Sequence, residues 1–69
     1  MTPLERECLA EAIEKRRKED DFEQSLSRAL RRREQPYEIY IHLIGMVREA
    51  AGKERKDLFK VAEQLLGST

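Results

Sequence analysis

Residues 37–51 read Tyr-Glu-Ile-Tyr-Ile-His-Leu-Ile-Gly-Met-Val-Arg-Glu-Ala-Ala, and this stretch decides the fold. Its first eight residues are rich in strand formers and alternate between two sets, as a strand would. Over the whole stretch, however, the residues that are not apolar recur at spacings of four, three and four, which is a helical period. They are Glu38, His42, Gly45 and Glu49, with Arg48 as the one exception. A helix with a single narrow polar stripe is buried over most of its surface, so we expect a central helix here.

Pro36 and Gly52 mark the two ends of this helix. A residue before proline is pushed out of the helical region, so the preceding helix should end near Glu34 and the central helix should cover about 36–51. Gly52 is a natural C-terminal cap. A last helix is expected over about 54–66, because its apolar residues recur at helical spacing. They are Leu58, Phe59, Val61, Ala62, Leu65 and Leu66.

The N-terminal segment begins with the pattern of a capping box. Thr2 is expected to cap a helix that starts at Pro3, where the missing N–H of proline costs nothing. Glu5 can then reach back to the free backbone donor of the cap. An apolar stripe follows at helical spacing, formed by Leu4, Cys8, Leu9, Ala12 and Ile13.

That stripe stops abruptly, because residues 14–21 contain no apolar side chain. One interpretation is a single helix over about 3–33 with a solvated middle. The other is a turn followed by a second helix, which gives helices over about 3–18 and 21–34. We favour the turn, because adjacent aspartates are poor interior helix formers and good caps.

Together these signals predict a single all-α domain, a bundle of three to four helices. The chain has 69 residues, which fits one domain. Residues 1–34 are expected to form a charged helical arm or hairpin, and residues 36–66 an apolar helical hairpin core. Of the 27 apolar residues, 16 lie in the last 35 positions, so we expect the C-terminal half to supply most of the core.

A domain of this size has a marginal core, and small domains usually add a disulfide, a metal or a partner chain. Cys8 is the only cysteine and His42 the only histidine, which excludes an internal disulfide and a four-ligand zinc site. Self-association is therefore the expected supplement. The alternative is a monomeric bundle that closes on itself.

Composition also narrows the function classes. The chain carries 14 basic and 14 acidic residues, balanced within each half, so charge favours neither a nucleic acid nor a membrane. We find no glycine-rich phosphate loop and no catalytic constellation, and expect neither an enzyme nor a cofactor, metal or small-molecule substrate. The acidic run at 19–21 lacks the spacing and the glycine of a calcium loop. Without an apolar run of membrane length or a signal peptide, we expect a cytoplasmic protein.

The leading hypothesis is a non-enzymatic helical module for protein–protein interaction or oligomerisation. The central helix has two apolar faces, and the thin stripes of residues 1–34 offer little cover for the second one. The expected partner is the chain itself, as a dimer or larger assembly, or another helical protein. The residues expected at this interface are Tyr37, Tyr40, Ile41, Ile44, Leu58, Phe59 and Leu66.

The alternative is a small DNA- or RNA-binding regulator. Its candidate contacts to phosphates or to an acidic partner are Arg28, Arg31, Arg32 and Arg33, with Tyr37 and Tyr40 close by for base stacking. These arginines also suit the C-terminal end of a helix, where the helix dipole favours positive charge. Residues 44–63 partly match a helix-turn-helix with Gly52 in the turn, but Arg48 and Lys53 depart from its pattern. Lys53, Arg55 and Lys56 would be further basic contacts.

Overall fold

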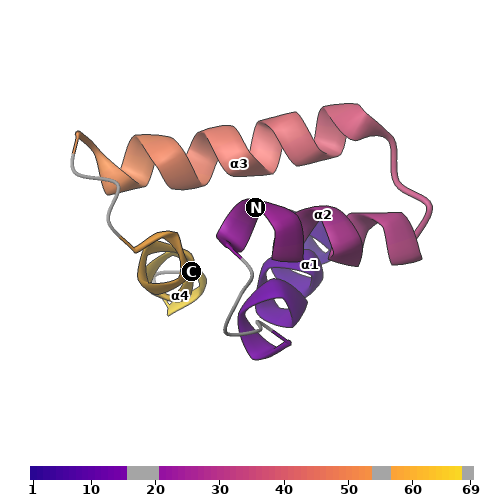
Figure 1. Cartoon of the computed structure of the whole chain (residues 1–69), viewed down its shortest axis with the longest axis horizontal. Helices are drawn as coiled ribbons and strands as arrows, with labels where there is room; N and C mark the ends of the chain where they lie inside the picture. Colours follow the sequence, from indigo (N-terminus) through magenta and orange to yellow (C-terminus); the bar gives the residue numbers. More distant parts are fainter. Residues whose placement is uncertain (16–20, 54–56, 68–69) are drawn as a thin grey trace.

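The computed structural model describes residues 1–15, 21–53 and 57–67, and these segments form four α-helices. The helices are α1 (Pro3–Glu14), α2 (Phe22–Arg32), α3 (Tyr37–Ala51) and α4 (Leu58–Gly67). The predicted all-α fold is confirmed, and the described segments contain no strand. The long helix α3 lies along one side of the molecule, with α1, α2 and α4 on the other side of it (Figure 1).

The N-terminal region forms two helices, as favoured from the sequence, and not one. Helix α1 ends at Glu14, earlier than predicted, and Lys15 is its C-cap. Helix α2 starts at Phe22, and the side chain of its N-cap Asp21 accepts a hydrogen bond of 2.8 Å from the backbone N–H of Gln24. Residues 16–20, which include the rest of the turn predicted near 18–21, lie outside the described residues. The aspartate cap therefore marks the start of α2, as its residue type predicts.

The capping box at the start of α1 is confirmed in both directions. The Thr2 hydroxyl accepts a bond of 3.2 Å from the backbone N–H of Glu5, and the Thr2 backbone N–H donates to Glu5 Oε1 at 2.8 Å. The second carboxylate oxygen of Glu5 lies 3.1 Å from Nε2 of His42 on α3. This buried carboxylate thus both completes the cap and links the start of α1 to the middle of α3.

The connection from α2 to α3 is a tight turn that ends α2. Backbone N–H groups of Glu34 and Gln35 donate to the carbonyls of Arg31 and Leu30 at 3.0 and 3.1 Å, which is the Schellman pattern. The pattern requires a left-handed residue, and Glu34 supplies it with φ 53°. Pro36 follows in extended conformation as the N-cap of α3, one position before the first turn in which the sequence placed it.

The C-terminal end of α3 is as predicted. Gly52 is the C-cap with φ 71° and ψ −152°, a conformation that L residues rarely adopt. Its backbone N–H donates to the carbonyls of Arg48 and Glu49. The predicted polar stripe of α3 is also confirmed, because all four of its members are exposed: Glu38, His42, Gly45 and Glu49.

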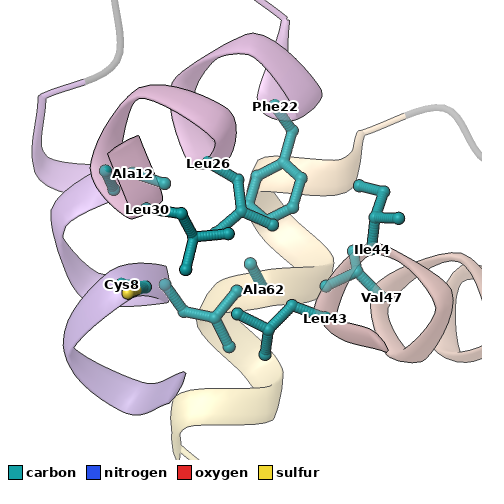
Figure 2. Packing of buried hydrophobic residues seen from close by; sticks show 11 residues of the cluster. Cys8, Ala12, Phe22, Leu26, Leu30, Leu43, Ile44, Val47 and Ala62 are labelled. Atoms are coloured by element: carbon teal, nitrogen blue, oxygen red, sulfur yellow. The ribbon is translucent and has the colours of Figure 1, made fainter. Parts of the chain in front are cut away.

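The core differs from the prediction that the C-terminal half would supply most of it. Seven of the eleven buried apolar side chains come from α1 and α2, and Figure 2 shows the cluster: Cys8, Leu9, Ala12, Phe22, Leu26, Ala29, Leu30, Leu43, Ile44, Val47 and Ala62. The narrow stripes of α1 and α2 turn fully inward. The broader apolar surfaces of α3 and α4 exceed what the other helices can cover, so most of their members pack against the core while only partly buried.

We predict that Glu34→Gly stabilises the fold by about 0.5–1 kcal/mol. A left-handed conformation costs an L residue roughly 1–2 kcal/mol, and glycine avoids this cost. Part of the resulting stabilisation is offset, because glycine gives the unfolded chain more conformational entropy. Urea unfolding followed by circular dichroism measures the change. The matched control is Gly52→Ala, which should destabilise, because it introduces an L residue at a positive φ. A Glu34→Gly variant no more stable than the parent would contradict this account of the turn.

We also predict that Glu5→Gln flattens the loss of stability in acid. The hydrogen bond from the Thr2 backbone, helped by the Thr2 side chain and the charge of His42, lowers the pKa of Glu5 below its ordinary value of 4.5, although burial opposes the shift. The folded state therefore holds the proton less tightly than the unfolded state. This contribution to stability is complete above about pH 4.5 and is lost as the pH falls through the folded pKa.

Unfolding free energies of parent and variant measured between about pH 6 and pH 3 test this, with the two curves converging in acid. Glu49→Gln, an exposed carboxylate on α3, is the control and should keep the parental slope. Equal slopes for the parent and Glu5→Gln would show that the cap carries no pH dependence.

Candidate interaction surface

Two large apolar side chains on α3 face outward. Tyr37 is 69% exposed and Ile41 is 50% exposed, and they stand one turn apart on the same side of the helix. Among the described residues, the only other large apolar side chain that is exposed is that of Met1, at the start of the chain. Tyr37 and Ile41 therefore form an exposed apolar pair at the edge of the α3 face that is buried in the core.

The other residues predicted for an interface lie deeper. Ile44 is only 3% exposed and belongs to the chain's own core. Tyr40, Leu58, Phe59 and Leu66 are half-buried and pack against the core cluster. The ring of Phe59 meets that of Phe22 edge to face, with centroids 5.6 Å apart. The fold thus leaves Tyr37 and Ile41 as the most accessible members of the predicted set.

An open groove of about 630 Å³ lies between α2 and α3, and Tyr37 is one of the residues that line it. The two helices run in opposite directions (Figure 1). The tyrosine rings of Tyr37 and Tyr40 stack on one another at the groove, with centroids 5.4 Å apart and planes at 22°. The lining residues are Asp21, Glu23, Gln24, Ser27, Arg28, Arg31, Tyr37 and Tyr40. We call this groove, together with the exposed Ile41, the α2–α3 surface.

A smaller hollow of about 180 Å³ extends the groove toward the turn between the two helices. It shares Ser27, Arg31 and both tyrosines with the larger groove. The additional lining residues are Leu30, Gln35 and Pro36. The α2–α3 surface is therefore continuous from the start of α2 to the Schellman turn.

Charge is unevenly distributed along the groove. Asp21 and Glu23 lie at the start of α2, and we call them its acidic end; Arg28 and Arg31 lie further along, and we call them its basic end. Arg48 of α3 pairs with Glu23 at the acidic end. Burial, helped by the charge of Glu23, raises the pKa of Tyr40, so its hydroxyl stays protonated and remains a hydrogen-bond donor. The surface therefore offers both signs of charge around an aromatic centre.

The structure divides the four arginines that the sequence grouped together. Arg28 and Arg31 line the groove, whereas Arg32 and Arg33 reach α1. There Arg33 Nη1 donates to Glu11 Oε1 at 3.0 Å, and Arg32 Nη1 lies 3.6 Å from Glu11 Oε2. The sequence carried no signal for this pairing, because Glu11 and Arg33 are 22 positions apart.

The helix-turn-helix segment spans the connection between α3 and α4, and part of that connection, residues 54–56, lies outside the described residues. Lys53 is exposed after the end of α3. The other two basic positions of the alternative, 55 and 56, lie outside the described residues.

Cys8 and His42, the single residues of their types, occupy different environments. Cys8 has no exposed surface, and burial raises the pKa of its thiol, which disfavours the reactive thiolate. His42 is exposed on α3 and pairs with Glu5. In the described part of the chain, no three His, Cys, Asp or Glu side chains are grouped to hold a metal ion.

Comparison with known proteins adds no relative: no family model, curated protein or solved structure matches this chain. None of the helices in the described segments has the length and apolar character needed to cross a lipid bilayer.

We predict that Arg33→Ala and Arg31→Ala differ in their effect on stability. Arg33 joins α2 to Glu11, whose side chain is 16% exposed, so its loss should cost about 1 kcal/mol. Arg31 lies exposed at the groove, and its loss should change stability by less than about 0.5 kcal/mol. Urea unfolding of the two variants measures the difference, and equal losses would show that the Glu11 pairing does not stabilise the fold.

Proposed function

We propose that this chain is a non-enzymatic helical interaction module that self-associates through its α2–α3 surface. The observation that carries the proposal is the exposure of Tyr37 and Ile41, one turn apart on α3. Exposed apolar side chains of this size are common singly. An adjacent pair, one member of which lines a groove, is the kind of exposed apolar surface that marks an interaction site.

The size of the hydrophobic gain supports association. Complete burial of a large apolar side chain contributes about 1.5–3 kcal/mol relative to leaving it in water. A symmetric dimer would cover Tyr37 and Ile41 twice, together with the half-buried Tyr40 at the floor of the groove. In a 69-residue chain without an internal disulfide, this gain is comparable with the stability that its own core provides.

The distribution of charge favours a protein partner over a nucleic acid. Two of the four arginines are held by Glu11, and the other two share their groove with Asp21 and Glu23. A phosphate backbone would meet repulsion from those carboxylates, and the chain as a whole has no net positive charge. A protein surface carrying both signs of charge would not be repelled.

One observation still favours the nucleic-acid alternative, namely the stacked Tyr37 and Tyr40 beside Arg28 and Arg31. Aromatic platforms next to arginine suit single-stranded bases. That function requires binding of a labelled oligonucleotide that weakens steeply with salt and is lost in Arg31→Ala. Binding of this kind by a monomeric chain would favour the alternative over self-association.

The proposal predicts that Ile41→Asp converts a dimer of about twice 8.1 kDa into an 8.1 kDa monomer with unchanged helicity. A buried carboxylate without a partner would oppose the apolar contact between copies, whereas Ile41 contributes little to the core of one copy. Light scattering gives the mass, and circular dichroism gives the helicity.

Ala10→Asp is the matched control, because it adds the same charge at an exposed helical position on α1, and it should leave the dimer intact. Ile44→Asp should instead unfold the chain, because Ile44 is buried. A parent protein that stays at 8.1 kDa up to millimolar concentration would overturn the proposal.

A further inference from the structure

We infer that two copies of this chain pack antiparallel across their α2–α3 surfaces, so that the basic end of each α2 lies against the acidic end of the other. This inference rests on the proposed self-association and adds the partner's orientation. It follows from the order of charges along α2 and from the symmetry that a dimer imposes.

Charged side chains of opposite sign lie at the two ends of α2. The acidic end, Asp21 and Glu23, and the basic end, Arg28 and Arg31, line one groove on one side of the helix. Gln24 and Ser27 lie between the two ends. Glu23 already pairs with Arg48, and Asp21 caps α2, yet each carboxylate has further acceptor positions. The surface is thus acidic at one end and basic at the other.

A two-fold axis can place two copies of this surface against each other in two ways. In a two-fold dimer, each surface meets a copy of itself, and the axis lies in the plane of contact. An axis along the helices would make the copies parallel and set like ends together. An axis across the helices makes them antiparallel and sets Arg28 and Arg31 beside the partner's acidic end. Opposite charges attract and like charges repel across an interface, so the antiparallel arrangement is favoured.

The surface of α3 is compatible with the same rotation. The antiparallel rotation brings Tyr37 toward the C-terminal part of α3 in the other copy, where Arg48 lies. An arginine side chain packs well on an aromatic face. A pairing centred between Ile41 and Gly45 would set each isoleucine against the other copy's glycine. Gly45 is exposed in the middle of α3, and a Cβ there would meet no atom within 4 Å. Nothing within the isolated chain therefore requires a glycine at this position. A second backbone that approached α3 closely would require one.

The same charges argue for a second copy as the occupant, rather than an unrelated helix. An acidic amphipathic helix would be attracted by the charges of Arg28 and Arg31 but repelled by those of Asp21 and Glu23. A basic helix would have the opposite conflict. A copy of the chain in antiparallel orientation complements both ends at once.

The sign of a charge effect at Gln24 tests the orientation. Gln24 is exposed, adjoins the acidic end, and uses only its backbone N–H in the described cap of α2. In the antiparallel dimer, Gln24→Glu places a carboxylate near the partner's basic end at two symmetric sites, and should lower the dimer dissociation constant about three- to tenfold. Gln24→Arg should raise it by a similar factor. Sedimentation equilibrium at low salt measures these constants.

Gln64→Glu is the matched control, because it makes the same change at an exposed position on α4 and should leave the constant unaltered. In a parallel dimer, Gln24→Glu would face a second carboxylate and weaken association, which would overturn the inference. A dimer unaffected by either Gln24 variant would also overturn the inference while leaving self-association standing. A parent chain that remains monomeric would overturn the proposed function itself, and the inference with it.

Discussion

The burial of one face of α2 is the interaction on which the rest of the structure depends. Phe22, Leu26 and Leu30 point into the cluster that α1, α3 and α4 surround (Figure 2). Phe22 also contacts the ring of Phe59, which ties α4 to the start of α2. With a single cysteine and a chain of 69 residues, this packing is what closes the domain. It also fixes the orientation of α3, because its buried side must face α2 and α4.

That orientation determines what α3 presents outward. Leu43, Ile44 and Val47 enter the core, so Tyr37 and Ile41, displaced around the helix, are left at its edge. Because apolar side chains cover most of α3, no rotation of the helix hides all of them behind the remaining three helices. The exposed pair is thus a consequence of having one helix that is more apolar than its neighbours can cover, and association is a physical means of covering the excess.

The charges of this chain act locally, although they sum to zero. Some complete helix caps, as Glu5 and Asp21 do, and others join helices, as Glu11 does through Arg33. The charges around the groove are arranged with opposite signs at its two ends. The net charge of zero therefore does not mean that charge is evenly spread, because the groove is acidic at one end and basic at the other. Such a charge pattern favours one orientation of a partner over the opposite one.

The sequence by itself determined the local features of this protein. The capping box at Thr2, the aspartate cap of α2, the glycine cap of α3 and the exposed stripe of α3 all follow from residues within one or two turns of each other. Local signals also predicted the order of the helices and favoured four helices over three. The boundary of α1 was placed too late, because no glycine or proline marks it and charged residues are compatible with a helix.

Only the tertiary structure decided which apolar residues are buried and which charges share a surface. Ile44 and Ile41 are equally apolar in sequence, yet one is in the core and the other is half exposed. Likewise Arg31 and Arg33 are two positions apart, but one lines the groove and the other pairs with Glu11 across 22 positions. Both outcomes depend on how the helices are rotated against one another. That rotation is set by the sum of many contacts between distant segments, and no local pattern encodes it.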